Sequence, residues 1–320
     1  MLLFVELFTE VFVPILLVAG FGFRLDRVFK LDLRSLVKLN IYLFVPCFIF
    51  VRVASADLQG AEAVRIVVFT AAMVGILGGL ALVAAKMLGL DVAGRKTLQL
   101  ASMFYNCGNW GIPLMALAYG AEGEAVQIFV LMTMNISTFT IGLWLVSTHR
   151  AEVEGGSESK RPPVWKTLLP VLRQPALYGV ACGLLVRAFN VPVQEFGPVW
   201  EPLELVAAGL VPFALVTLGV QLSQTKPPPL RGKLTVALVL KLLIGPAIAV
   251  PMTWAFGFEG VTAAVLILGA GAPAAVNTAL LAHEFGADSH FATAAVFYST
   301  VLSLVTSAVI LTVLKLTVAG

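Results

Sequence analysis

The fold is decided by residues 104–113, FYNCGNWGIP, which interrupt a long hydrophobic segment. Inside a regular helix a Gly costs about 1 kcal/mol and a Pro about 3 kcal/mol relative to Ala. The two Asn side chains add polar groups that need partners inside a membrane. A second apolar segment has the same kind of interruption at residues 269–278, GAGAPAAVNT. The two stretches predict a pair of broken helices.

The composition around these stretches is that of an integral membrane protein. The chain has 320 residues, of which 59% are hydrophobic and 12% are charged, and its mean hydropathy is +0.95. Soluble domains carry about twice that charged share. This composition excludes a soluble enzyme and a disordered chain. A net charge of +3 is too small an excess of positive charge to indicate nucleic-acid binding. We expect the chain to lie in a lipid bilayer.

A membrane-spanning helix needs about 20 mostly apolar residues. A polar stretch at 149–166 separates two halves, 1–148 and 167–320, and we predict five spans in each half. Most of the 21 Lys and Arg residues fall in connections on the side of that polar linker. The bias predicts a multi-pass protein of the plasma (inner) membrane with a cytoplasmic linker and both termini outside. The predicted spans are 3–23, 36–54, 65–88, 96–119, 124–147, 175–190, 199–222, 232–256, 261–284 and 291–316.

The two halves contain similar residues at one constant separation. Pro46 corresponds to Pro212, and residues 119–121, YGA, correspond to residues 285–287, FGA. Five spans is an odd number, so the second copy would enter the membrane from the opposite side. The result is an inverted repeat, the architecture of many secondary transporters. The alternative is coincidence within a biased composition.

Interrupted spans at corresponding places in two halves indicate a transport site. The helix breaks are assigned to Gly111, Pro113, Gly271 and Pro273. Half-helix N-termini that meet near the bilayer midplane favour an anion. The alternative is that the Gly residues are helix-packing contacts and the Asn residues bridge helices. The predicted substrate-binding residues are the polar and small groups at these breaks and on neighbouring spans: Asn106, Gly108, Asn109, Asn135, Lys241, Asn277, Thr278 and Tyr298.

Lys241 is the one basic residue deep inside a predicted span. An ionisable residue inside a membrane suggests function by default. Lys241 can counter a carboxylate substrate, or it can tether backbone carbonyls of the broken helices. No Asp or Glu lies at a comparable depth, so we predict neither a metal site nor a cofactor. A coupling sodium ion could still be held by backbone carbonyls, Asn and hydroxyl groups.

The residues resemble the auxin efflux carrier family, which includes the plant PIN auxin exporters and bacterial malate or malonate carriers. The pattern Asn106-x4-Gly111-Ile112-Pro113-Leu114 is similar to the motif of its fourth helix, and Pro273 with Asn277 is similar to its ninth. The resemblance implies an all-α fold of ten transmembrane helices in a 5+5 inverted repeat with crossed, broken helices 4 and 9. It also implies kinship with sodium/proton antiporters and bile acid symporters, a homodimer, and an elevator-type motion of a transport domain against a scaffold.

We therefore expect a secondary active transporter, an efflux carrier, for a small organic anion such as a carboxylate. The short linker is typical of bacterial members and argues against auxin itself. Coupling to protons or to sodium is open. One alternative is a sodium-coupled organic anion symporter of the bile acid type. An intramembrane enzyme and a channel are the others, and no paired catalytic residues support an enzyme.

Overall fold

The computed structural model describes residues 2–55, 60–146, 172–225, 229 and 232–318. The predicted linker at 149–166 lies outside these residues. The described residues are helical, with no β-strand among them. They include seven helices that are long and apolar enough to cross a membrane, which confirms a polytopic all-α membrane protein. The count of ten spans stays a prediction.

The first half of the chain contains seven named α-helices, α1 to α7. Short connections join some of them, and π-helical turns run directly into the next helix elsewhere, so that 2–29, 33–55 and 107–146 are each one continuous rod. The elements are α1 (Leu2–Leu7), η1 (Phe8–Phe12), α2 (Val13–Phe29), α3 (Leu33–Leu39), η2 (Asn40–Phe44), α4 (Val45–Ser55), α5 (Gly60–Met87), α6 (Val92–Met103), η3 (Cys107–Gly111), α7 (Ile112–Ser137) and η4 (Thr138–Gly142).

The second half also contains long rods and shorter helices. Two apolar helices, α10 and α15, fall below the length of a full span. The elements are α10 (Pro175–Ala188), the 3-10 turn η6 (Val193–Glu195), α11 (Gly197–Ala208), α12 (Leu210–Gln224), α13 (Gly232–Val239), η7 (Leu240–Ile244), α14 (Gly245–Ala255), α15 (Gly260–Ala270), α16 (Val276–Glu284) and α17 (Ser289–Val318).

Proline residues explain most of the π-helical turns. Four of these turns end two residues before a proline, at Pro14, Pro46, Pro113 and Pro246. Proline has no N–H, and its ring collides with the carbonyl four residues earlier in a regular helix. A wider turn relieves that collision without ending the rod, and such turns are frequent at functional sites.

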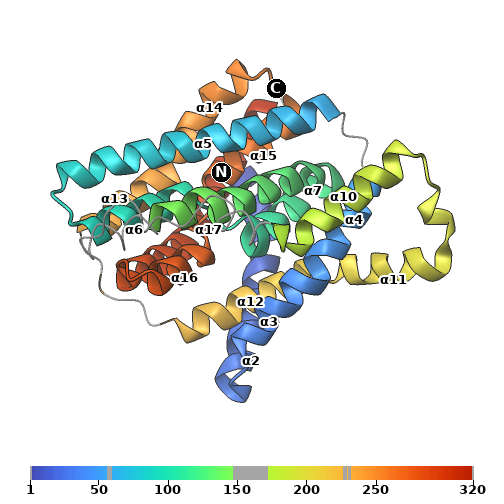
Figure 1. Ribbon diagram of the computed structural model, residues 1–320, viewed down its shortest axis with the longest axis horizontal. Coiled ribbons are helices and arrows are strands. Elements are labelled where there is room, and N and C mark those ends of the chain that lie inside the picture. Colours follow the sequence, from blue (N-terminus) through green and yellow to red (C-terminus); the bar gives the residue numbers. More distant parts are fainter. Residues whose placement is uncertain (1, 56–59, 147–171, 226–228, 230–231, 319–320) are drawn as a thin grey trace, which may run out of the picture.

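The helices pack as two groups. The first group comprises 2–55 and 172–224, in which α2 packs on α12 and α4 packs on α10 and α11. The second comprises 60–146 and 232–318, in which α5 packs on α6 and α7, and α15 packs on α7 and α14. In Figure 1, α2, α3 and α12 lie together at the bottom of the view, whereas α5 and α14 lie at the top. Each half of the chain therefore contributes to both groups.

Gly120 divides the longest rod. Its backbone has φ 60° and ψ −146°, a conformation that a residue with a Cβ rarely adopts. The rod of residues 107–146 is consequently two helices that meet at this kink. The kink falls where the sequence analysis ends its fourth span, at 119, shortly before its fifth begins.

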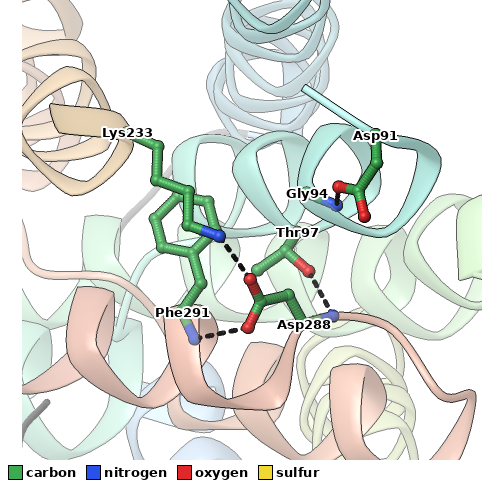
Figure 2. Close-up of polar contacts among 6 residues, drawn as sticks. All are labelled: Asp91, Gly94, Thr97, Lys233, Asp288 and Phe291. Carbon is green, nitrogen blue, oxygen red and sulfur yellow. Dashed lines mark hydrogen bonds and ion pairs between the residues drawn. The ribbon is translucent and has the colours of Figure 1, made fainter. Parts of the chain in front are cut away.

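Polar contacts fasten one end of the second group, as Figure 2 shows. Asp288 precedes α17, where its carboxylate accepts the Phe291 N–H at 3.0 Å and forms an ion pair with Lys233 of α13. Its own N–H donates to Thr97 Oγ1 of α6 at 3.1 Å. Burial raises the pKa of Asp288, but the hydrogen bonds and the charge of Lys233 outweigh it, so the pKa lies below its ordinary value.

Candidate functional site

The two interruptions meet directly. The Asn106 N–H donates to the Pro273 carbonyl at 2.8 Å, and the Ala275 N–H donates to the Phe104 carbonyl at 3.1 Å. Tyr105 and Ala274 lie opposite one another as an antiparallel pair. Backbone groups that a helix break exposes must find partners when they are buried in a membrane protein. Each interruption supplies those partners to the other.

Side chains brace the first interruption. Asn106 Oδ1 accepts the Asn109 N–H at 3.1 Å and so caps the rod that continues into α7. Gln127 Nε2 donates to the Cys107 carbonyl at 3.0 Å. Gly111 makes room for that amide, because a Cβ there would collide with Gln127 Nε2. The chain therefore needs both an amide and a glycine to hold this geometry.

Lys241 lies behind the crossing. Its Nζ lies 3.4 Å from the Ser102 carbonyl oxygen and 4.2 Å from the centroid of the Tyr105 ring. Ser102 belongs to the last turn of α6, where the helix dipole favours a cation. The aromatic face adds a cation–π contact. These are the contacts of the tether that the sequence analysis weighed against a role as substrate counter-ion.

The second interruption has fewer side-chain partners. Ser299 Oγ accepts the Ala274 N–H at 2.9 Å. Ala275 occupies the N-cap of α16 and supplies no capping side chain. The Thr278 hydroxyl turns back to the Ala275 carbonyl at 2.6 Å. The first N–H groups of a helix have no partner within it, so the N-terminus of α16 is open to a ligand.

A cavity of about 360 Å³ lies beside the crossing, between the two helix groups. This volume is within the range of small-molecule sites. Its lining includes Val276 and Asn277 from the start of α16. None of the described residues that line it is Lys, Arg, His, Asp or Glu. The polar part of the lining consists mainly of carboxamides, those of Asn40, Asn106, Asn109, Asn135, Gln174, Gln221 and Asn277.

The structure brings most of the predicted substrate-binding residues to this cavity. Thr278 is buried in the first turn of α16, Lys241 is buried behind the crossing, and the Tyr298 ring packs on Phe297. These three do not line the cavity. Their roles toward a substrate, like those of the lining residues, stay predictions. The predicted residues that line it are Asn106, Gly108, Asn109, Asn135 and Asn277.

The predicted break residues differ in where they lie. Gly111 and Pro113 lie inside the continuous rod of residues 107–146, after the break itself, and the η3 turn before Pro113 relieves the collision of its ring with the preceding carbonyl. Gly271 is the C-cap of α15, and a Cβ there would approach Ile310 to 3.0 Å. Pro273 supplies the carbonyl that accepts from Asn106. The breaks therefore shape the backbone, and the amides face the cavity.

Two contacts that join the helix groups were not predicted from the sequence. Asn40 of η2 donates from its Nδ2 to Asn109 Oδ1 at 2.6 Å. Arg52 of α4 forms an ion pair of 2.7 Å with Glu124 of α7, which is 6% exposed. Asn40 could have been singled out from the sequence, because it is a polar residue in the first turns of the predicted span 36–54. No sequence pattern identifies its partner.

The described residues offer little to a tightly held metal ion. Within 2–55, 60–146, 172–225, 229 and 232–318, no three His, Cys, Asp or Glu side chains come together. An ion in this part of the chain would have to use amide, hydroxyl and backbone oxygens.

Comparison with known proteins gives consistent results over nearly the whole chain. A family model described as "membrane transport protein" matches residues 7–311. An uncharacterized transporter of Methanothermobacter thermautotrophicus is 28% identical over 305 residues, which cover 93% of this chain and 95% of that protein. An uncharacterized transporter of Methanocaldococcus jannaschii is 23% identical over 310 residues, covering 91% of this chain and 93% of that protein.

Proposed function

The chain belongs to the membrane transport protein family, that of the auxin efflux carriers, and from this premise we propose that it is a secondary carrier for a small organic anion. The observation that carries the proposal is the cavity at the crossing. Two interrupted helices meet there, one of them with an uncapped N-terminus, and amide side chains surround the space. The helix N-terminus favours an anion over a cation, and the amides can donate hydrogen bonds to a carboxylate.

The proposed binding mode places a carboxylate against the start of α16. Its N–H groups and the positive end of its dipole favour an anion. Asn277 adds an amide beside them, and Asn106 adds a buried Nδ2 that has no partner in the structure. A carboxylate oxygen at Asn106 would satisfy that donor, and hydrogen bonds to a charged group contribute about 1.5–3 kcal/mol each.

The proposed transport step is a movement of the second helix group past the first. The cavity lies between the two groups, so a relative displacement would open it to alternate sides of the membrane. The Asn40–Asn109 hydrogen bond and the Arg52–Glu124 ion pair both join one group to the other. An elevator-type movement must break these two contacts, and both would form again when the carrier returns.

Cross-linking the groups tests this movement. The half-buried native thiol Cys47 and the exposed native thiol Cys182 are first replaced by Ser. Arg52→Cys and Glu124→Cys are then introduced together into that protein. A short bifunctional methanethiosulfonate should then stop transport in proteoliposomes while substrate binding persists, and a reductant should restore it. Continued transport by the cross-linked protein would contradict an elevator-type movement.

A matched control places the same cross-link within one group. The Thr262 hydroxyl of α15 donates to Glu62 Oε1 of α5 at 2.8 Å, and both helices belong to the second group. Glu62→Cys with Thr262→Cys should therefore be cross-linked without loss of transport. Loss of transport in this control would show that the reagent, and not the link between the groups, is responsible.

The substrate class is tested by thermal shift followed by flux. A ligand that binds only the folded protein raises its melting temperature. We expect organic carboxylates to do so and neutral amides of the same carboxylic acids to do so much less. Uptake of the best carboxylate into proteoliposomes with and without a sodium gradient then separates a sodium-dependent symporter from a carrier that uses protons or exchange.

A further inference from the structure

Two amide groups of opposite character are left without partners at the wall of the cavity. Asn106 Nδ2, a donor, and Asn40 Oδ1, an acceptor, are both buried and make no hydrogen bond. Asn106 is 7% exposed and Asn40 is 6% exposed, and both line the cavity. A buried polar group without a partner costs about 1–3 kcal/mol. A ligand that satisfies both would recover that cost.

The backbone fixes the orientation of the first amide. The Asn109 N–H can only donate, and its partner is Asn106 Oδ1 at 3.1 Å. Asn106 therefore presents its Nδ2 as the free group. Asn40 uses its Nδ2 on Asn109 Oδ1 at 2.6 Å, which leaves its Oδ1 as the free acceptor. Asn109 lies between the two and is bonded to both.

We propose that Asn40 is a specificity-determining residue that selects a monocarboxylate with an O–H or N–H donor next to its carboxylate. The inference rests on the proposed function and narrows its substrate class. A carboxylate oxygen accepts from Asn106 Nδ2, and the neighbouring donor of the same substrate is accepted by Asn40 Oδ1. A 2-hydroxy acid has these two groups on adjacent carbons, and the two amides are neighbours because both bond to Asn109.

The charge of the lining limits the substrate to one carboxylate. No cationic side chain lines the cavity among the described residues, and Lys241 lies behind the Tyr105 ring contact. An ionised group is very costly to bury without a partner. One carboxylate can be served by the start of α16 and Asn106. A second would have no positive group to meet, whereas Leu131, Met134 and Phe139 offer contacts to an apolar body.

Three probes that differ at one position test the selection. They are 2-hydroxy-3-phenylpropanoate, 3-phenylpropanoate and 2-methoxy-3-phenylpropanoate, whose Kd values are measured by calorimetry on the purified full-length protein. The wild type should bind the hydroxy acid at least about tenfold more tightly than the other two, because a site built to bond a hydroxyl rejects ligands that lack it. The dicarboxylate 2-hydroxysuccinate should bind more weakly than the hydroxy acid.

Asn40→Leu assigns the selection to this residue. We expect the variant to bind the hydroxy acid and 3-phenylpropanoate equally, through a higher Kd for the hydroxy acid alone. Asn135→Leu, which changes another amide of the same cavity, should keep the wild-type ratio even if both Kd values rise. Should Asn40→Leu fail to fold, Asn40→Ala is measured with the same probes, and a wild-type ratio in that variant overturns the assignment.

The failures of the two proposals are distinguishable. Equal wild-type binding of the hydroxy acid and 3-phenylpropanoate, an unchanged ratio in Asn40→Leu, or tighter binding of the dicarboxylate would overturn this inference and leave an organic anion carrier in place. If no carboxylate binds the wild type in this series or in the thermal-shift screen, the proposed function itself fails.

Discussion

The two interruptions are held in very different ways, although each supplies backbone bonds to the other. The first has its own capping side chain, Asn106, and further polar contacts from Gln127 and Lys241. Among the described residues, the second has one side-chain bond from another helix, from the Ala274 N–H to Ser299, and one local bond, from Thr278 to the Ala275 carbonyl, and its helix begins without a capping side chain. The first is therefore held by its own side chains, whereas the start of α16 has no capping side chain, and the proposed function assigns that place to a ligand.

If an organic anion binds at the start of α16, as proposed, this difference explains how the site can bind its substrate and still release it. A fully satisfied pair of helix ends would gain nothing from a substrate. An open helix N-terminus opposite a rigid partner gains a hydrogen bond and favourable charge when an anion arrives. Carriers need binding that is specific but reversible, and the contrast between the two segments supplies it.

The largest effect is expected at Asn106, because it serves both structure and ligand. Asn106→Ala should lower the melting temperature, since loss of a helix cap costs about 1 kcal/mol, and should weaken carboxylate binding by about 10- to 100-fold. Asn106→Ser is the matched control, because its hydroxyl keeps a capping oxygen without adding a charge and removes the amide donor. Its melting temperature should match the wild type while anion binding stays lost; equal binding by all three proteins would remove Asn106 from the site.

Asn277 tests ligand binding at the second interruption separately from structural support. Its side chain makes no hydrogen bond that supports the described fold and faces the cavity at the open start of α16. We expect Asn277→Ala to weaken binding by about tenfold, the value of a single hydrogen bond to a charged group. Its melting temperature without ligand should equal that of the wild type. A large loss of stability would mean that the second segment is braced after all.

Ser299 tests the side-chain contact that α17 gives to the second segment. Ser299→Ala leaves the buried Ala274 N–H without its partner and should cost about 1–3 kcal/mol of stability. Ser303→Ala on the same helix is the control, because the Ser303 hydroxyl only turns back to the Thr300 carbonyl. Denaturation of both variants in detergent measures the difference. Equal stability of the two would show that Ser299 does not hold the crossing.

The smallest effect is expected away from the two segments, at Asp288, whose contacts join the start of α17 to α6 and α13 within the second helix group. Its lowered pKa means that its contribution to stability is fully present above the ordinary carboxyl value of about 4 and is lost as pH falls through the folded-state pKa. Wild type should therefore melt above Asp288→Asn near neutral pH, and the gap should close in acid. A gap that stays constant with pH would show that the ionised carboxylate is not the cause.

The sequence predicts the breaks well because glycine, proline and asparagine act locally. Residues 104–113 and 269–278 are costly in a regular helix wherever they lie, so their interruption follows from residue type alone. The prolines at positions 46 and 246 show the limit of this reasoning. They do not stop their rods, because π-helical turns absorb the missing hydrogen bond, and that outcome depends on the surrounding helices.

The cavity could be predicted only in part, because its walls come from distant segments. Asn106 and Asn277 stand out as amides beside breaks, whereas Asn40 lies in a span with no glycine near it. Its importance comes from contact with Asn109, a pairing that only the packing of the two groups creates. Lys241 is conspicuous in the sequence as a buried cation, yet its position behind the crossing depends on where α6 ends.

The most direct test of the account is counterflow in proteoliposomes with the carboxylate that gives the largest thermal shift. Wild-type protein should accumulate labelled substrate against an internal pool of unlabelled substrate, as a carrier does. Asn277→Ala at the same subsaturating concentration should lose about nine-tenths of that uptake. No counterflow by wild-type protein, or equal uptake by the two proteins, would contradict the claim that an organic anion is carried at this crossing.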